Sequence, residues 1–354
     1  MQFQLYDFLR EAAQRNVSGV YIIPGSPLSI LENGRTYQIG ERLMPADTEQ
    51  LIREAYTIAQ RETDEKLFSH GDDNFSFTLP GVSRFRISMF RQRNSYGCVI
   101  RLIRFNLPDP QELHIPAEVI NAANLEDGLV LTCGVSGSGI TTTLASIIQE
   151  INRTRQGKLI ITLEKPLEYL HSHDKCLVMQ REISTDTDDY ISGLDAVQYQ
   201  RPNVLLLSDM PTPEIVQKTI RIAQTGRLVL TTAFGSSTAN AIRSLVDMFS
   251  PDQQPSICAQ LANTLRLLIY QRMVTDVSGS LIPVFETVYL DDMLRGMLRA
   301  NDITSFEQTI AHSKTSGIIP FDRSLITMYR QQKITRETAS SQAINKAMVN
   351  RQIF

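Results

Sequence analysis

From residue 128 onward, apolar residues fall into short continuous runs separated by stretches of helical length. The runs cover Gly128–Thr132, Leu159–Leu163, Asn203–Leu207 and Arg227–Thr231. Strands that are apolar on both sides belong to sheets whose two faces are covered by helices. This part of the chain is therefore predicted to alternate parallel strands with helices.

The N-terminal part follows a different pattern. Apolar and polar residues mostly alternate with period two in Phe75–Leu79 and Phe85–Phe90, as in half-buried strands. Further predicted elements are helices over 3–15 and 48–60, a strand over 17–23 and a hairpin turn at Asn33-Gly34.

The run Leu107-Pro108-Asp109-Pro110 is typical of a linker. After Pro251 the pattern is mostly helical, with one predicted strand at Leu281–Tyr289. The predicted fold class is α/β, with a small mixed α/β N-terminal domain over 1–107 and a linker over 108–118. A second domain over 119–354 is predicted to hold the parallel sheet and a helical C-terminal part.

Composition excludes several classes of protein. Apolar residues make up 42% and charged residues 21% of the 354 residues, which is ordinary for a globular chain. The 35 Lys and Arg against 38 Asp and Glu argue against a nucleic-acid partner. Four separated cysteines fit neither a zinc site nor a disulfide scaffold. With no signal-peptide pattern and no long apolar run, we expect a cytoplasmic protein.

A glycine-rich loop follows the first apolar run. It matches the P-loop pattern G-x-x-x-x-G-K-[ST] at Gly134, Gly139 and Thr141, but the lysine position holds Ile140. Loop N–H groups and a helix N-terminus form a phosphate cradle, and Thr141 would hold Mg²⁺. The predicted nucleotide contacts are Gly134, Ser136, Gly137, Ser138, Gly139, Ile140, Thr141 and Thr142.

The missing lysine changes the chemistry expected at this loop. That lysine normally meets the β- and γ-phosphates and offsets the charge that develops during transfer, whereas isoleucine carries no charge. The motif alone leaves two interpretations open, a working nucleotide site and a tight glycine turn whose nucleotide function has been lost.

Motifs along almost the whole chain resemble the PilT-type ATPases of type IV pilus retraction, within the secretion ATPase family. The stretches that carry the resemblance are Phe75-Ser76-Phe77, Pro80-Gly81-Val82, Arg84-Phe85-Arg86, Gln180-Arg181-Glu182-Ile183, Gln224-Thr225-Gly226-Arg227 and Phe321-Asp322-Arg323-Ser324-Leu325. The resemblance implies a RecA-like P-loop domain, a hexameric ring, ATP and Mg²⁺ as cofactors, and an inner-membrane pilus platform protein as partner.

Several functional motifs of that family are altered in this chain. The acidic box keeps Glu164, which by resemblance would act near the metal or the attacking water, but Lys165 replaces the next aspartate. The Walker B strand ends in Asp209 where the family has glutamate, so this second catalytic carboxylate is one methylene shorter. Arg227 and Phe234 replace the two histidines of the histidine box.

The remaining candidate nucleotide contacts that the resemblance suggests are basic residues. In the family, N-domain arginines reach the nucleotide of a neighbouring subunit, and Arg86 and Arg101 are the nearest matches. A solvated strand face is the alternative role for both. New cations at Lys165, Arg201 and Arg227 could restore the charge that the phosphate loop has lost (hypothesis).

The favoured interpretation is a retraction-type subunit with impaired or absent ATP hydrolysis. It would bind ATP and Mg²⁺ weakly or not at all, and would act in a homo-hexamer or in a mixed ring with an active paralogue. The alternative is an active retraction motor with a non-standard phosphate site. An extension-type ATPase fits less well, because those relatives usually carry a cysteine-rich metal-binding insert. By resemblance, the protein could lie peripherally at the inner membrane.

Two further sets of residues are expected to be structural. Met293, Leu294, Met297 and Leu298 have helical spacing and are predicted to lie in the core. The five histidines are dispersed, and we expect them at the surface rather than at a metal.

Overall fold

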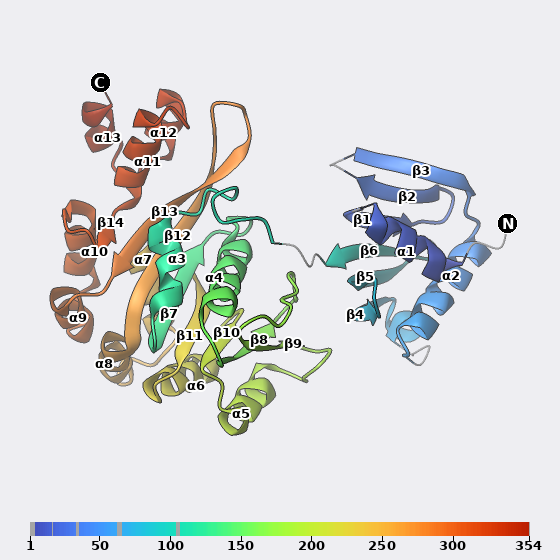
Figure 1. Cartoon of the computed structure of the whole chain (residues 1–354), viewed down its shortest axis with the longest axis horizontal. Helices are drawn as coiled ribbons and strands as arrows, with labels where there is room; N and C mark the ends of the chain where they lie inside the picture. Colours follow the sequence, from blue (N-terminus) through green and yellow to red (C-terminus); the bar gives the residue numbers. More distant parts are fainter. Residues whose placement is uncertain (1–3, 16, 33–34, 62–65, 104–106, 354) are drawn as a thin grey trace. The chain divides into compact units, whose positions relative to one another are not determined.

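A computed structural model describes residues 4–15, 17–32, 35–61, 66–103 and 107–353. The chain divides into two compact units, Met1–Asn106 with Glu168–Leu170, and Leu107–Leu167 with His171–Phe354 (Figure 1). The predicted hairpin turn at Asn33-Gly34 and Phe3 of the first predicted helix lie outside the described residues.

The first unit is a six-stranded antiparallel sheet in the order β3-β2-β1-β6-β5-β4, packed against two helices. Its elements are α1 Leu5–Gln14, β1 Gly19–Ile22, β2 Pro27–Glu32, β3 Arg35–Arg42, α2 Pro45–Ile58, a π-helical turn Lys66–His70, β4 Asp72–Leu79, β5 Ser83–Gln92 and β6 Ser95–Ile103. The period-two pattern is confirmed, because Phe75, Phe77, Phe85 and Ile87 are all buried on one face.

The second unit contains an eight-stranded sheet in the order β14-β13-β12-β7-β11-β10-β8-β9. Its strands are β7 Gly128–Gly134, β8 Leu159–Glu164, β9 Leu177–Glu182, β10 Val204–Leu207, β11 Leu228–Phe234, β12 Leu265–Thr275, β13 Leu281–Tyr289 and β14 Ile318–Ile319. Its helices are α3 Ala117–Ile120, a 3-10 turn Asn121–Asn124, α4 Ile140–Thr154, α5 Tyr190–Gln200, α6 Pro213–Gln224, α7 Thr238–Asp247, α8 Gln254–Thr264, α9 Asp292–Arg299, α10 Ile303–His312, α11 Phe321–Arg330, α12 Arg336–Gln342 and α13 Lys346–Gln352.

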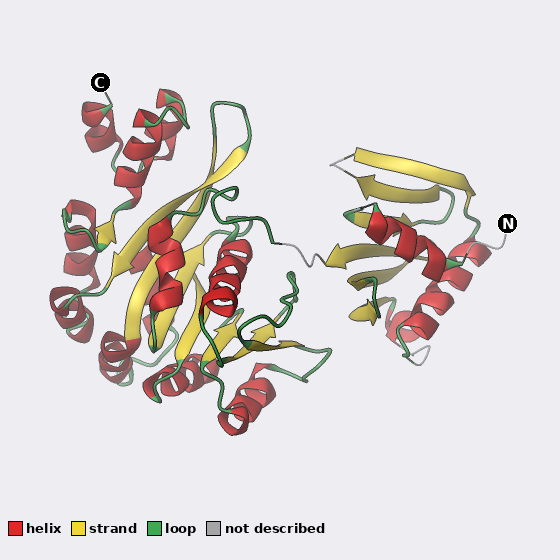
Figure 2. Ribbon diagram, viewed as in Figure 1, coloured by secondary structure: helices red, strands yellow, loops and turns green. Residues whose placement is uncertain are grey.

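The four continuous apolar runs form the parallel centre of this sheet, as predicted. Alternate residues of each run enter opposite cores: Leu129 and Leu131 pack on the side of α5 to α8, whereas Val130 packs on the side of α3 and α4. Helices therefore cover both faces (Figure 2). This burial explains why the runs show no polar alternation.

The predicted strand at Leu281–Tyr289 is confirmed as β13, but the prediction that it is the single strand after Pro251 was wrong. β12 is a long strand that runs parallel to β7 and antiparallel to β13, and β14 adds a short pair to β13. β12 starts at Leu265, immediately after α8 ends at Thr264. No turn residue separates α8 from β12, so the apolar pattern over both elements predicts one continuous helix.

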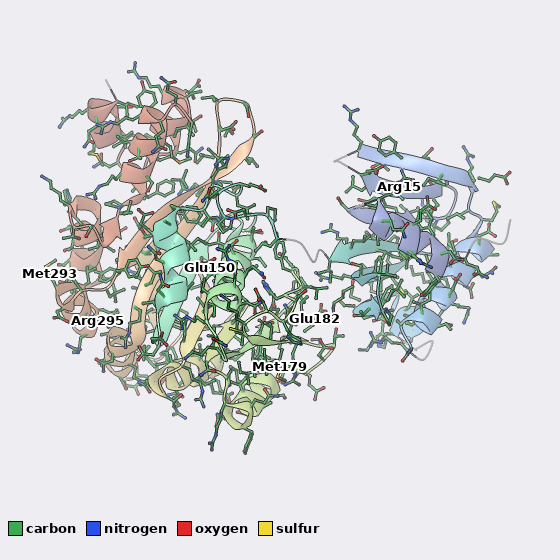
Figure 3. The ribbon with its side chains drawn as sticks, in the orientation of Figure 1. Arg15, Glu150, Met179, Glu182, Met293 and Arg295 are labelled. Atoms are coloured by element: carbon green, nitrogen blue, oxygen red, sulfur yellow. The ribbon has the colours of Figure 1, made fainter. Side chains whose placement is uncertain are left out.

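The predicted core face of α9 is correct at Leu294 and Leu298, both of which are fully buried. It is wrong at Met293, whose side chain is 54% exposed and points away from the sheet in Figure 3. On the same helix, Arg295 donates a hydrogen bond to the carbonyl oxygen of Ala262 at 2.6 Å.

A buried carboxylate in β13 joins helices that are far apart in sequence. Glu286 accepts hydrogen bonds from the hydroxyl of Thr238 at 2.6 Å and from the N–H of Phe321 at 3.3 Å. These hydrogen bonds hold the first turns of α7 and α11 against β13. Burial raises the pKa of Glu286. Asp322 accepts the backbone N–H groups of Ile344 and Asn345 in the same way, which holds the start of α13.

Leu298→Ala should lower the free energy of unfolding of the second unit by about 2–5 kcal/mol, because it leaves a cavity under α9. Met293→Ala on the same helix is the matched control. It should change stability by less than about 0.5 kcal/mol, since this side chain is largely in solvent. Urea unfolding followed by circular dichroism measures both. Equal losses in the two variants would contradict the burial described for α9.

Candidate functional site

The phosphate loop connects the end of β7 at Gly134 to the start of α4 at Ile140. Gly137 and Gly139 adopt positive φ angles of 79° and 85°, which residues other than glycine rarely take. The first N–H groups of α4 have no partner within the helix, and together with the loop they form a positively polarised cradle. The sequence-predicted strand, turn and helix thus come together as expected.

Gln271 in β12 fixes the path of this loop. A Cβ atom on Gly134 would lie 2.5 Å from the carbonyl oxygen of Gln271, and one on Gly139 would lie 2.9 Å from its Nε2. The buried hydroxyl of Thr143 donates to Oε1 of Gln271 at 2.7 Å. Glycine is required at Gly134 because a Cβ would collide with the backbone of β12, and at Gly139 because of its positive φ.

Ile140 offers a phosphate group no charge and no hydrogen-bond donor from its side chain. It is half-buried and packs against the apolar cluster between α4 and the sheet. Within the described residues, the buried Oγ of Ser138 has no hydrogen-bond partner. The loop therefore offers a hydroxyl and backbone amides that fit a phosphate group, but no cation from its own sequence.

The exposure of the remaining loop residues matches a ligand-accessible surface. Ser136 and Gly137 are exposed, and Thr141 and Thr142 are half-buried on the first turn of α4. Val135, at the start of the loop, is 54% exposed. A threonine hydroxyl at this position of a phosphate loop can ligate Mg²⁺, so Thr141 fits that ion.

The two candidate carboxylates lie at the same edge of the sheet as the loop, because β7, β8 and β10 are parallel. Glu164 ends β8 and is buried, and its Oε1 accepts the hydroxyl of Thr162 at 2.6 Å. Asp209 follows β10, and its Oδ1 accepts its neighbour's N–H, that of Met210, at 2.7 Å. Glu164 is therefore held firmly by its surroundings.

Phe234 also lies at this edge, directly opposite Gly134 in the ladder of β11 and β7. Its side chain is 72% exposed. An aromatic ring cannot act as a proton carrier or a charged phosphate ligand, which are the roles available to a histidine. The edge next to the loop is consequently apolar at Phe234 and Val135.

Within one chain, Arg227 and Arg201 lie too far from the phosphate loop to replace the charge of its missing lysine. The carbonyl oxygen of Arg227 accepts the N–H of Gly128, the first residue of β7, whereas the phosphate loop follows the last residue of that strand. Arg201 precedes β10 at the same far edge. Lys165 alone lies at the correct edge, exposed and next to Glu164.

Arg86 and Arg101 lie directly opposite each other on β5 and β6. Both are exposed, and neither forms an ion pair within the described residues. Two like charges in a cross-strand pair repel each other. An anion bound between them would relieve that repulsion.

A family model described as "Type II/IV secretion system protein" matches residues 9–347. The chain belongs to this family. It is 30% identical to the type IV pilus ATPase PilU of Pseudomonas aeruginosa over 97% of this chain and 89% of PilU. It is 28% identical to the type IV pilus retraction ATPase PilT of the same organism, over 95% of this chain and 97% of PilT.

Solved structures agree with this family membership. A crystal structure of the pilus retraction motor PilT with bound ADP matches with a TM-score of 0.88 at 29% identity. The match covers 99% of this chain and 100% of that one. The sequence-based predictions of a PilT-type secretion ATPase and of a mixed α/β unit followed by a RecA-like domain are therefore confirmed.

Sequence reasoning missed the residues that hold this secretion-ATPase site in shape. Gln180 of β9 donates to Glu164 at 3.3 Å and accepts the N–H of His171 at 2.8 Å, so it ties the loop after β8 to the carboxylate. His171 in turn contacts Oε1 of Gln149 on α4 at 2.9 Å. His171 is half-buried, so the prediction of a surface histidine was wrong at this position.

Two further properties concern the described residues only. None of their helices has both the length and the apolar character needed to cross a bilayer. Among the same residues, no three His, Cys, Asp or Glu side chains are grouped as a metal site would require.

Stability should depend on pH through His171, because burial lowers its pKa to about 4. The unfolded chain takes up this proton near pH ~6.5, so stability falls as the pH drops from there toward 4. Thermal unfolding across this range should show a shallower slope for His171→Gln. The exposed His312→Gln serves as control and should keep the wild-type slope. An unchanged slope in His171→Gln would contradict the burial of this imidazole.

Proposed function

We propose that this protein is a subunit of a type IV pilus retraction machinery that hydrolyses ATP slowly or not at all. The family membership and the names of its relatives PilU and PilT support the pilus role. The protein would work in a ring, either a homo-hexamer or a mixed ring with an active paralogue. It would act at the cytoplasmic side of the inner membrane, on the pilus platform protein.

The packing of Ile140 carries this proposal. Its side chain contributes to the apolar cluster beside α4, so the cradle has backbone amides and Ser138 but no lysine. Backbone N–H groups can hold phosphate without a cation. They do not supply the positive charge that offsets the developing charge on a transferring phosphoryl group. ATP with Mg²⁺, held at Thr141, is therefore expected to bind weakly.

Asp209 and Phe234, at the same end of the sheet, are also expected to slow hydrolysis. The carboxylate of Asp209 reaches less far than a glutamate would, and a general base must lie within hydrogen-bond reach of its proton. Phe234 places an exposed ring where the family has a histidine. Binding and assembly would then matter more than turnover in this subunit.

One observation favours the second candidate, an active retraction motor. Glu164 is buried and held by Thr162 and Gln180, an arrangement suited to a residue that orients water or metal-bound groups. Lys165 lies beside it and would have to supply the missing charge.

ATP hydrolysis by the purified protein with Mg²⁺ separates the two candidates. The proposal expects turnover at or only slightly above background in the wild type and no rescue by Ile140→Lys alone, because Asp209 and Phe234 remain. An active motor would instead show hydrolysis that Glu164→Ala abolishes. Phosphate release measured for wild type, Ile140→Lys and Glu164→Ala decides between them.

The arginine pair provides a test of assembly. If Arg86 and Arg101 hold the nucleotide of a neighbouring copy, either one changed to glutamine should weaken ADP binding about tenfold in the assembled protein. The exposed Arg93→Gln, in the turn between β5 and β6, is the matched control. Calorimetry at concentrations above and below assembly measures the effect. Losses of equal size in all three variants would contradict a specific role for the pair.

A further inference from the structure

A cavity of about 810 Å³ lies within the second unit, on the far side of β12 from β7. Its floor is formed by Pro283, Val284 and Phe285 of β13, and its walls by residues 111–118 and by α11. None of the residues that line it belongs to the phosphate loop. Its volume is in the range of roughly 300–1,000 Å³ that is typical of small-molecule sites.

Hydrogen bonds hold the walls of this cavity in place. Tyr289 donates its hydroxyl to the carbonyl oxygen of Glu118 at 2.9 Å, which ties α3 to β13. Ser324 on α11 donates to the carbonyl oxygen of Phe285 at 2.6 Å. The N–H of Ile115 donates to Pro110 at 2.8 Å and closes the turn that forms the opposite wall. The cavity is therefore preformed.

The lining combines an apolar interior with an excess of positive charge. Phe285, Ile319 and Met328 contribute apolar surface. The charged residues of the lining are Lys314, Arg323 and Lys333 against Glu118, three cations and one carboxylate, with His114 as a further titratable group. The formal excess is two positive charges, so an anion is favoured over a cation.

We propose that this cavity binds a small organic anion that has a flat apolar ring system and a carboxylate, sulfonate or phosphate group. The ring would lie against Phe285 and Met328. The anionic group would meet Lys314 beyond the Tyr289 end of β13, or Lys333 beyond the Leu281 end. Such a ligand would contact both the turn at the start of the second unit and α11. It would occupy a site separate from the phosphate loop.

The fluorescent probe 8-anilinonaphthalene-1-sulfonate has this chemistry, and the full chain can be titrated with it. We expect one saturable site per chain with increased fluorescence. Lys314→Glu combined with Lys333→Glu should weaken binding about tenfold or more, because the lysine at each end of the cavity is reversed and the sulfonate loses its partner in either orientation. The matched control reverses two exposed lysines elsewhere, Lys66→Glu with Lys175→Glu, and should leave binding within about twofold of wild type.

A second variant blocks the cavity without changing charge. Thr327 lines its rim on α11, and Thr327→Trp should abolish the saturable site while melting temperature stays close to wild type. Unchanged probe binding in both variants would place the probe elsewhere and overturn the proposal. Absence of a saturable site would overturn it too. A change in oligomeric state without a change in probe binding would assign this face to contacts between copies instead.

Discussion

The close approach of the phosphate loop to Gln271 is the constraint on which the rest of the site depends. Gly134 leaves no room for a side chain between the loop and the backbone of β12, Gly139 has a positive φ, and Thr143 bonds α4 to the same glutamine. The loop therefore has a single path from β7 into α4. That path brings its N–H groups to the edge where Glu164 and Asp209 also end their strands.

The loop and strands keep this arrangement, but the side chains at the end of the sheet beside the loop are less suited to phosphate than those of the family. The cation that should meet phosphate is replaced by an apolar residue that joins the neighbouring core, and an exposed ring stands at Phe234. Under the proposed function, the scaffold that would position a nucleotide is retained, while groups that would stabilise a transferring phosphoryl group are lost. On that proposal, such a subunit would assemble and respond to nucleotide without driving hydrolysis itself.

The parallel centre of the second sheet could be predicted from the sequence, because β7, β8, β10 and β11 are buried on both sides and appear as continuous apolar runs. β12 could not be separated from α8 because no turn residue lies between them. Thr143 and Gln271 are 128 residues apart in the sequence, so no local sequence pattern predicts their hydrogen bond. The role of Gln180 was hidden for the same reason, since it acts through Glu164 on a neighbouring strand.

Under the proposed function, backbone amides would hold the phosphates without help from a cation of the phosphate loop. Parallel calorimetric titrations with ATP and with ADP, both with Mg²⁺, test this most directly. Because Ile140 stands where the phosphate loop would have its lysine, the two affinities should be weak and within about threefold of each other. A preference for ATP of about tenfold or more, accompanied by phosphate release, would contradict the account and identify a working motor.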